Sequence, residues 1–500
     1  LGYIDAETLA AARDEVDSGK LHTVQSEAQA PWVAEMVRDE MVRRFGQEAY
    51  TSGYEVVTTL DTTRQAAANA ALRRALLDYS KRHGYRGPEA HAELEGMEPM
   101  DWPSLLRDYP ARGGLVAGLV VQVDGKAVQV LLLSGETVSI DWDGLAWAQP
   151  YKSANRKGAE LKVAADILAV GDIIRVEAGE DDKWLLAQVP QAQGALVSLR
   201  PEDGAIMALV GGFDFGGSKF NRVTQAMRQP GSSFKPIIYS SALESGFTPA
   251  SIINDAPVVF DDTALEATWR PENYSGKFYG PTRLREALYR SRNLVSIRVL
   301  RTVGAPVAAS YAERFGFAAE QLPKDLTLAL GSASATPLQM ARAYAVFANG
   351  GFRVKPYFIT RIHDNEGNVI ESARPVVVCP DCPQTLEDLA GQLQPLPLAE
   401  AVITPQNAWL MDSMMRDVIQ RGTGQRARAL GRSDLAGKTG TTNDQKDAWF
   451  CGYNPSLVAV SWVGFDRLEP LGRGETGGRA ALPMWMAYMG DALKGTPVRS

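Results

Sequence analysis

The spacing of apolar side chains divides the chain into three parts of different character. The first part, residues 1–112, opens with charged, helix-patterned sequence such as APWVAEMVRDEMVRRFG, and GYEVVTTLD at 53–61 then alternates as a strand does. The alanine-rich stretch TTRQAAANAALRRALLDYS follows, and its leading threonines suit a helix cap. We expect these elements to act as linker and scaffold.

Short apolar strands separated by turn residues fill the second part, residues 113–190. GLVAGLVVQVDGKAVQVLLLSGETVSID predicts strands joined at Asp124-Gly125 and at Ser134-Gly135, and GDIIRVEAGEDDKWLLAQV predicts a further hairpin. Strands of this length and spacing are typical of small barrels and sandwiches. We predict a small OB-like β-barrel domain that serves as an interaction or spacer module.

Helical and strand patterns alternate in the third part, residues 191–500. GALVSLRPEDGAIMALVGG predicts two strands around a turn at 202–204, and TPLQMARAYAVFANGG predicts a helix with Thr336 as its cap and Pro337 at its first position. Residues 371–403, rich in Pro, Leu and Glu, are predicted to be an insertion in a loop. The chain is therefore predicted to be a multidomain α/β protein.

Composition narrows the possible partners. The chain has 500 residues, a hydrophobic content of 45% and a formal net charge of −7 without a basic block, so we expect no nucleic acid as a partner. No apolar run reaches the length of a membrane span. Because it starts at Leu1 without a signal pattern, we expect the chain to be a fragment that lacks an N-terminal portion.

The three cysteines give no metal site. Cys379 and Cys382 form a C-x-x-C pair in VVVCPDCPQ, Cys451 stands alone, and a zinc site would need a second pair or nearby histidines. A local disulfide is favoured over two free thiols, and a redox or metal role is favoured least. We expect no metal and no cofactor.

Three short motifs are candidates for the chemistry: RQPGSSFKPI at 228–237, SRN at 291–293 and GKTGTT at 437–442. The first alone would be an ordinary helix start, but together the three favour a nucleophile. Ser232 and Lys235 lie three apart and share a helix face, within hydrogen-bonding reach. Lysine becomes a base when burial and a second cation make its charged form costly, and Lys438 is the candidate cation. Ser291 could pass a proton to a leaving amine, while Asn293 positions the substrate amide.

Backbone groups complete this candidate site. The N–H groups of Ser232 and Thr441 are suitable donors for an oxyanion, and Gly440 lets the strand be approached closely. Thr439 and Thr441 offer hydroxyls to a substrate carboxylate, and the strand edge could pair with an extended peptide.

Two other site types fit less well. The four histidines, at positions 22, 83, 91 and 363, lie away from all three motifs, and RIHDNEGN around His363 is typical of a strand that runs into a turn, so a Ser-His-Asp triad is disfavoured. GRGETGG at 472–478 fits G-x-G-x-x-G, but no second βα unit can follow it before residue 500, which disfavours dinucleotide binding.

The order S-x-x-K, S-x-N and K-T-G is that of penicillin-binding proteins and β-lactamases. The chain resembles the class A penicillin-binding proteins, most of all their 1A type in Gram-negative bacteria. Blocks in the family's order cover residues 190–500, and TTLDTTRQAAANAAL resembles the linker between the family's two catalytic domains. The blocks are FNRVTQAMRQPGSSFKP, RPENYSGKFYGPTRLREALYRSRN, TPLQMARAYAVFANGG, RGTGQRARAL, GKTGTTNDQKDAWFCGY and GGRAALPMW.

The resemblance implies a penicillin-recognising serine transpeptidase fold, in which helices cover an antiparallel sheet. It makes Ser232 the acylated nucleophile, Lys235 its proton acceptor, and Ser291 and Asn293 the S-x-N pair. Residues 438–441 become the strand that lines the substrate. The implied substrates are peptidoglycan stem peptides ending in D-Ala-D-Ala, which β-lactam antibiotics mimic.

The resemblance also implies a place on the periplasmic side of the bacterial inner membrane, and a possible outer-membrane or cell-wall synthesis regulator bound through the OB-like domain. The family's glycosyltransferase domain and membrane anchor are expected to be absent, so we expect no glycan polymerisation. A D,D-carboxypeptidase, a serine β-lactamase and a non-catalytic cell-wall scaffold remain as alternatives. Between the S-x-N and K-T-G motifs no Glu is followed four residues later by Asn in a suitable loop, which favours the transpeptidase over the β-lactamase.

Overall fold

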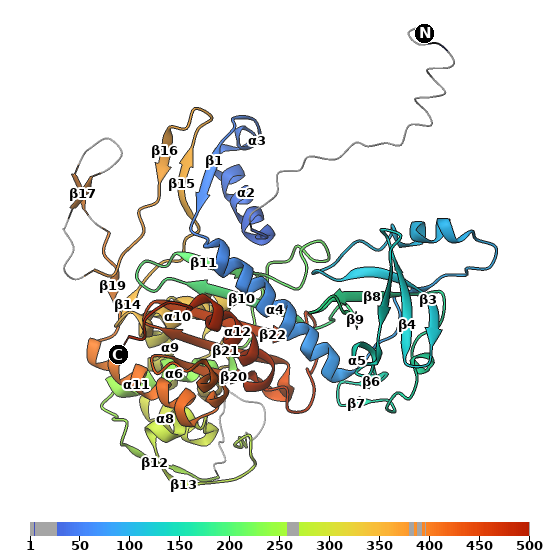
Figure 1. Cartoon of the computed structure of the whole chain (residues 1–500). Coiled ribbons are helices and arrows are strands. Elements are labelled where there is room, and N and C mark those ends of the chain that lie inside the picture. The colour runs from blue at the N-terminus through green and yellow to red at the C-terminus, as the bar shows by residue number, and fades with distance from the viewer. Residues whose placement is uncertain are drawn as a thin grey trace.

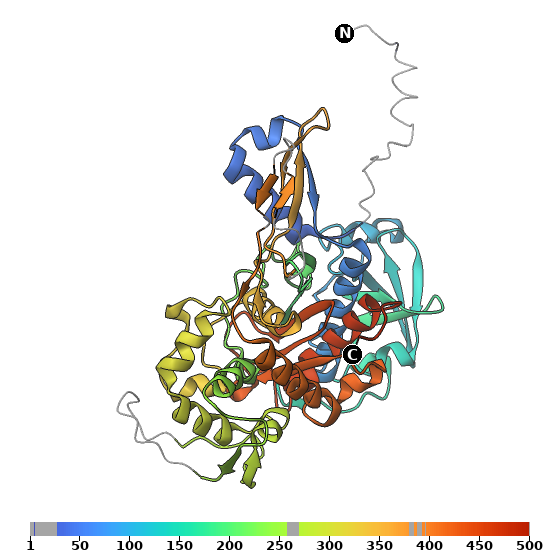
Figure 2. The ribbon, with the colours of Figure 1, turned by 90° about the vertical axis from the view of Figure 1, so that its left-hand side faces the viewer.

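The computed structural model describes residues 28–257, 270–379, 385–387, 393–395 and 397–499, together with Asp5. A large α/β domain and a smaller β domain lie side by side, and the long helix α4 (Thr62–His83) runs from one toward the other (Figure 1). A third group of elements projects from the large domain (Figure 2). It consists of α2 (Pro31–Phe45), α3 (Glu48–Thr51), β1 (Glu55–Thr58), β15 (Ile359–His363) and β16 (Val369–Ser372).

A five-stranded antiparallel sheet forms the centre of the large domain, in the order β11-β10-β22-β21-β20. The strands are β10 (Gln193–Leu199), β11 (Ile206–Val210), β20 (Ala436–Thr441), β21 (Asp447–Asn454) and β22 (Leu457–Gly464). Every residue of β11, β21 and β22 is buried, as expected for strands covered on both faces. The predicted turn at 202–204 joins β10 to β11.

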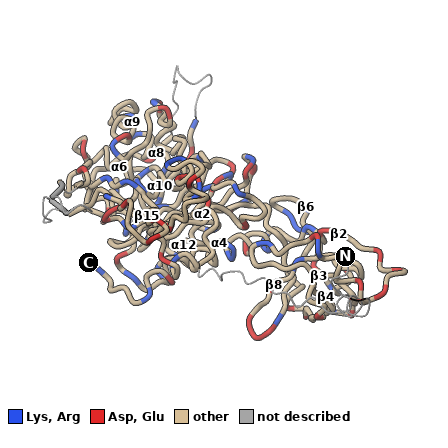
Figure 3. Tube along the Cα trace, turned by 90° about the horizontal axis from the view of Figure 1, so that it is seen from above, with Lys and Arg blue, Asp and Glu red and all other residues tan. Residues whose placement is uncertain are grey.

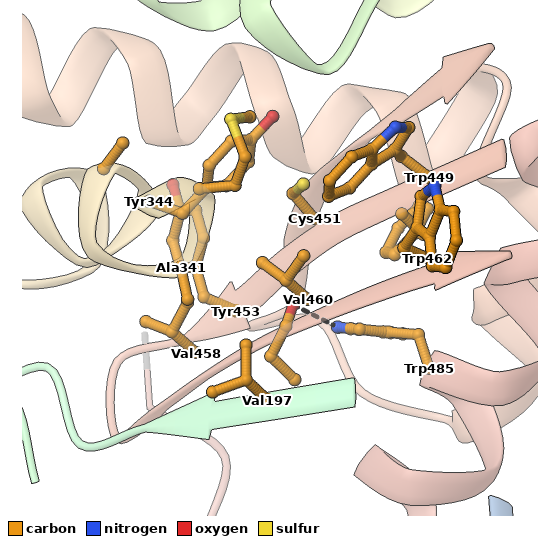
Figure 4. Close-up of a cluster of buried hydrophobic side chains, with 14 of the residues drawn as sticks. Val197, Ala341, Tyr344, Trp449, Cys451, Tyr453, Val458, Val460, Trp462 and Trp485 are labelled. Atoms are coloured by element: carbon orange, nitrogen blue, oxygen red, sulfur yellow. Dashed lines mark hydrogen bonds between the residues drawn. The ribbon is translucent and has the colours of Figure 1, made fainter. Parts of the chain in front are cut away.

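Helices cover this sheet. α4 and α12 (Leu482–Ala492) pack together against β10, β11 and β22, while α10 (Pro337–Ala348) and α11 (Pro405–Arg421) pack against the sheet as a second group. Figure 4 shows Tyr344 of α10 and Trp485 of α12 within the core, where the Trp485 indole N–H donates to the Ala459 carbonyl at 3.1 Å. Further helices form a lobe beside the sheet: α6 (Lys235–Glu244), α7 (Leu284–Tyr289), α8 (Asn293–Val303) and α9 (Ala305–Glu313).

The helix starts test two predictions from local sequence. Thr336 caps α10 as predicted: its hydroxyl accepts the Gln339 N–H at 3.2 Å, and the Gln339 side chain accepts the Thr336 N–H at 2.9 Å. The prediction of a threonine cap for α4 was wrong. The cap is Asp61, whose carboxylate accepts the Arg64 N–H at 2.9 Å, because a carboxylate one residue earlier reaches the free amides of the first turn.

The smaller domain is a sheet in the order β2-β8-β3-β4-β5, with β9 also paired to β8. Its strands are β2 (Ala90–His91), β3 (Val116–Asp124), β4 (Ala127–Leu132), β5 (Thr137–Ile140), β8 (Asp172–Ala178) and β9 (Trp184–Ala187). Gly125 and Gly135 have φ of +55° and +84° in the two predicted turns, which confirms both hairpins. β2 and the buried Tyr85 belong to this unit although they precede residue 113.

The projecting group joins distant parts of the sequence, because β1 pairs antiparallel with β15, and β15 pairs with β16. The predicted strand at 53–61 is thus confirmed in part. Within the predicted insertion at 371–403, residues 380–384, 388–392 and 396 lie outside the described residues, and Cys382 is among them. Cys379 is disulfide-bonded, and Cys451 is a buried free thiol.

Charged residues of both signs alternate along the chain trace, without an extended basic stretch in the part drawn (Figure 3). Among the described residues, no helix combines the length and the apolar character needed to cross a membrane.

Candidate active site

Ser232 lies in a short 3-10 turn, Gly231–Phe234, that leads directly into α6 at Lys235. Gly231 has φ of +56°, and a Cβ atom there would come 2.7 Å from the Thr441 carbonyl oxygen, so glycine lets this turn approach β20. Ser232 is partly exposed, whereas its two neighbours are buried. In the described part of the chain, the Ser232 hydroxyl has no hydrogen-bond partner, which leaves it accessible to a ligand.

Lys235 is fully buried and points its ammonium group at the S-x-N turn. Nζ donates to Asn293 Oδ1 at 2.8 Å and to the Ser291 carbonyl at 3.0 Å, with Ser291 Oγ and the Arg292 carbonyl each at 3.4 Å. The expected hydrogen bond between Lys235 and Ser232 is not among the interactions of the described residues. Carbonyl and amide oxygens, which are strong acceptors for an ammonium group, hold Nζ instead.

Ser291 links the two lysines. Its Oγ accepts from Lys438 Nζ at 2.9 Å and lies 3.4 Å from Lys235 Nζ, and Lys438 also donates to the Thr439 carbonyl at 2.9 Å. Ser291 has φ of +59°, a conformation that non-glycine residues rarely adopt and that surrounding contacts must hold in place. The hydroxyl is therefore placed to carry a proton between two amines.

Burial sets the charge of both lysines. It lowers the pKa of Lys235 well below its usual range, and the neighbouring Lys438 lowers this pKa further while Asp255 opposes the change. Burial also lowers the pKa of Lys438 to about 7. The predicted conditions for a neutral, basic lysine are thus both present at Lys235.

Strand β20 forms the edge of the central sheet next to the nucleophile turn. A Cβ atom on Gly440 would collide with the Pro230 carbonyl and the Ser233 hydroxyl, so this glycine allows the close approach that the sequence predicted. The Thr441 hydroxyl accepts the Gly477 N–H at 3.0 Å, and the Thr439 hydroxyl lies 2.6 Å from that of Thr423. These contacts orient both hydroxyl groups.

Sequence reasoning missed the groups behind these motifs. Asn273 accepts the Asn293 N–H at 2.8 Å and donates to the buried Asp255, and Arg228 pairs with Asp447 at 2.7 Å under the nucleophile turn. Asn273 stands in the block RPENYSGKFYG, whose position just before the S-x-N motif was the available signal. No sequence signal marked Asp255, since a single Asp at the end of a strand is common.

The described histidines take no part in this site. His91 contacts Asp172 in the smaller domain, His83 lies 3.4 Å from Glu475, and His363 ends β15 as predicted; His22 lies outside the described residues. No group of three His, Cys, Asp or Glu side chains within the described ranges could hold a metal ion.

Comparisons with known proteins match this fold and site. Residues 194–465 match the penicillin-binding protein transpeptidase domain, and residues 85–192 match the penicillin-binding protein OB-like domain. The chain belongs to the penicillin-binding proteins that carry a transpeptidase domain, which confirms the fold class predicted from the motifs.

The relatives specify the type. Penicillin-binding protein 1A of Pseudomonas aeruginosa is 47% identical over 529 residues, which cover all of this chain and 64% of that protein. Penicillin-binding protein 1A of Escherichia coli is 39% identical over 99% of this chain and 66% of its own length. The crystal structure of penicillin-binding protein 1A from Haemophilus influenzae aligns with a TM-score of 0.88 and 38% identity, over 100% of this chain and 75% of that one. The chain thus spans about two thirds of the curated relatives' length.

Proposed function

We propose that this chain is a D,D-transpeptidase that cross-links peptidoglycan stem peptides through an acyl-enzyme on Ser232. The observation that carries the proposal is the Ser291 hydroxyl, which contacts the amines of both Lys235 and Lys438. Ser232 lies three residues before Lys235, and its hydroxyl has no hydrogen-bond partner among the described residues. Serine acyl transfer requires a nucleophile, a neutral amine and a proton relay near one another.

In the acylation step, the Ser232 oxygen attacks the carbonyl carbon of the penultimate D-Ala, and Lys235 Nζ takes the Ser232 proton. The backbone N–H groups of Ser232 and Thr441 stabilise the oxyanion. The carbon–nitrogen bond then breaks, and the terminal D-Ala leaves as its amine takes a proton through the Ser291 hydroxyl, which is resupplied by a lysine ammonium. The product is an ester between Ser232 and the stem peptide.

In the second step, the amine of a neighbouring stem peptide attacks this ester. Lys235 accepts the amine's proton, a new amide bond forms, and the Ser232 oxygen leaves with a proton returned from the lysine. No described strand pairs with the outer edge of β20, so this edge offers backbone groups to an extended peptide, and Thr439 and Thr441 line the position of its carboxylate.

Hydrolysis of the acyl-enzyme is expected to be slow, which favours the transpeptidase over a β-lactamase or carboxypeptidase. Activation of a water needs a carboxylate or similar base beside the ester. Among the described residues, the carboxylate that faces Lys235 is Asp255, which is fully buried and accepts two hydrogen bonds from Asn273. We therefore expect penicillin to remain on Ser232 for many minutes.

Mass spectrometry after incubation with penicillin tests the assignment. The intact chain should gain the mass of one penicillin, peptide mapping should place it between Arg228 and Lys235, and Ser232→Ala should abolish it. Ser233→Ala is the matched control, since this neighbouring serine is buried and should not be required. An adduct retained in Ser232→Ala would contradict the proposal, and many turnovers per second with nitrocefin would favour a β-lactamase.

We also propose a location on the periplasmic side of the inner membrane, where stem peptides are exposed. The disulfide at Cys379 suits an oxidising compartment. The OB-like domain is the proposed contact for an outer-membrane or cell-wall synthesis regulator. Cross-linking of the whole cell envelope, followed by identification of peptides joined to residues 85–192, tests this contact.

A further inference from the structure

A buried carboxylate lies behind the S-x-N turn and outside the motifs. Asp255 ends β12 (Ile252–Asp255) with no exposed surface. Its two carboxylate oxygens accept from Asn273 Nδ2 at 2.8 Å and 3.0 Å, and Arg292 Nε lies 4.0 Å away. Burying a carboxylate costs stability even when it is paired, so a buried carboxylate at this position indicates a role in the site.

Asn273 connects this carboxylate to the lysine. Its Oδ1 accepts the backbone N–H of Asn293 at 2.8 Å, and Asn293 Oδ1 accepts from Lys235 Nζ at 2.8 Å. The Asn293 amide is fixed on its other side, because its Nδ2 donates to the Glu272 carbonyl at 2.9 Å. The acceptor that orients Lys235 is thus itself held by Asn273, and Asn273 by Asp255.

The same carboxylate acts on Lys235 through its charge. Lys438 of β20 faces Lys235 as a second cation, and Arg292 approaches from the turn before α8. Among the described residues, Asp255 of β12 is the acidic group that opposes them. Tyr239 on α6 also faces Asp255 but is neutral near pH 7, because burial raises its pKa. When Lys235 receives the Ser232 proton, a positive charge forms in a dry site, and the charge on Asp255 stabilises it.

From these contacts we infer that Asp255 and Asn273 are positioning residues for acylation: they hold the Ser291–Asn293 turn against Lys235 and supply the negative charge that favours protonation of this base. The inference rests on the proposed function, because it assigns these residues to the same acyl transfer to Ser232.

The test is the pH dependence of penicillin acylation in Asp255→Asn, measured by rapid mixing and mass spectrometry. Asn keeps the shape but removes the charge, so the maximal rate should fall at least about tenfold. The acid limb should move to lower pH, because a base without its neighbouring anion loses its proton more readily. The ratio of variant rate to wild-type rate should thus be about tenfold higher on the acid limb of the wild-type profile than on its plateau. If the acid limb of the Asp255→Asn profile lies at the same pH as in the wild type, the inference that the Asp255 charge acts on Lys235 is overturned.

Asn273→Ala separates the effect of positioning the Ser291–Asn293 turn from the effect of the Asp255 charge. It also keeps the test decisive if Asp255→Asn fails to fold. This variant retains the carboxylate but loses the contact to Asn293, so its rate should fall about tenfold or more without a shift of the limb to lower pH. A folded Asn273→Ala that acylates at the wild-type rate would overturn the inference.

Asp417→Asn is the matched control. Asp417 is a buried carboxylate on α11 that pairs with Arg285 and Arg421, so its loss should lower stability without moving the pH profile. A wild-type chain that penicillin never acylates would refute the proposed function itself, whereas unchanged variants of a reactive wild type would refute this inference alone.

Discussion

Replacing Lys438 by methionine should stabilise the large domain while it abolishes acylation, and the gain in stability should fade as pH rises. Lys438 is fully buried, and this burial lowers its pKa from 10.5 to about 7. Each pKa unit corresponds to about 1.4 kcal/mol, so the difference between 10.5 and 7 lowers the free energy of unfolding by about 5 kcal/mol at low pH. This loss of stability is the cost of burying the charged form of Lys438 in the active site.

The direction of the pH dependence follows from where the proton is held. Between about pH 7 and pH 10.5 the unfolded chain keeps the Lys438 proton and the folded chain releases it, so the stability of the wild type rises with pH across this window. The decrease in the free energy of unfolding that Lys438 causes has its full size below about pH 7. It falls to about 2 kcal/mol near pH 9 and vanishes near pH 10.5.

Methionine has a similar volume and no charge, but it gives up the hydrogen bonds to Ser291 Oγ and the Thr439 carbonyl. These are worth about 1 kcal/mol each. The net expectation is a gain of about 3 kcal/mol near pH 6 and no gain near pH 9.

Urea denaturation followed by tryptophan fluorescence measures this difference, because Trp449, Trp462 and Trp485 are buried in the core of the same sheet (Figure 4). Lys494→Met is the control: Lys494 is exposed at the end of α12, and its replacement should change stability little and equally at both pH values. An equal stability difference between wild type and Lys438→Met near pH 6 and near pH 9 would refute the reasoning.

Three further changes test separate parts of the structure. Gly440→Ala should slow penicillin acylation at least about tenfold in rapid mixing, because the new Cβ displaces the Pro230 carbonyl from the strand; a wild-type rate would contradict the close packing. Although burial opposes ionisation of Glu475, its contacts with His83 and Arg82 lower its pKa to about 2, so Glu475→Gln should lose about 3 kcal/mol of stability near pH 7. This stabilisation is present above about pH 4.5 and disappears toward pH 2, so denaturation of the variant and the wild type should converge in acid. Cys379→Ser should leave the acylation rate unchanged, and a loss of labelling would show that the disulfide supports the site.

The motifs predicted the groups that meet at the site because helix and strand periodicity is local information. Gly440 was expected to allow a close approach, and it lies against the Pro230 carbonyl and the Ser233 hydroxyl. The spacing of Ser232 and Lys235 placed both at the start of one helix, although the expected hydrogen bond between them is not among the described interactions. The α/β architecture and the OB-like hairpins were likewise readable from strand length and turn residues such as Gly125.

The partners of those groups could not be predicted, because they come from segments far apart in the sequence. Only the folded turn shows that Asn293 Oδ1 and the Ser291 carbonyl accept the shortest hydrogen bonds from Lys235. Asp255 lies 38 positions before Asn293 and carries no pattern that marks it. The α4 cap was misassigned for a simpler reason, since Asp61 and the threonines after it are all good caps and geometry decides among them.

The pairing of β1 with β15 constrains the order in which the chain can be completed. The Thr360 hydroxyl donates to the Val57 carbonyl across 303 positions of sequence, and α4 packs on α12 from the opposite end of the chain. Within this chain, β1 and α4 must therefore keep apolar surface uncovered until partners hundreds of positions later in the sequence have formed. Contacts this distant slow folding and prolong exposure to aggregation, so these two elements are where a holding chaperone would act on the partly folded chain.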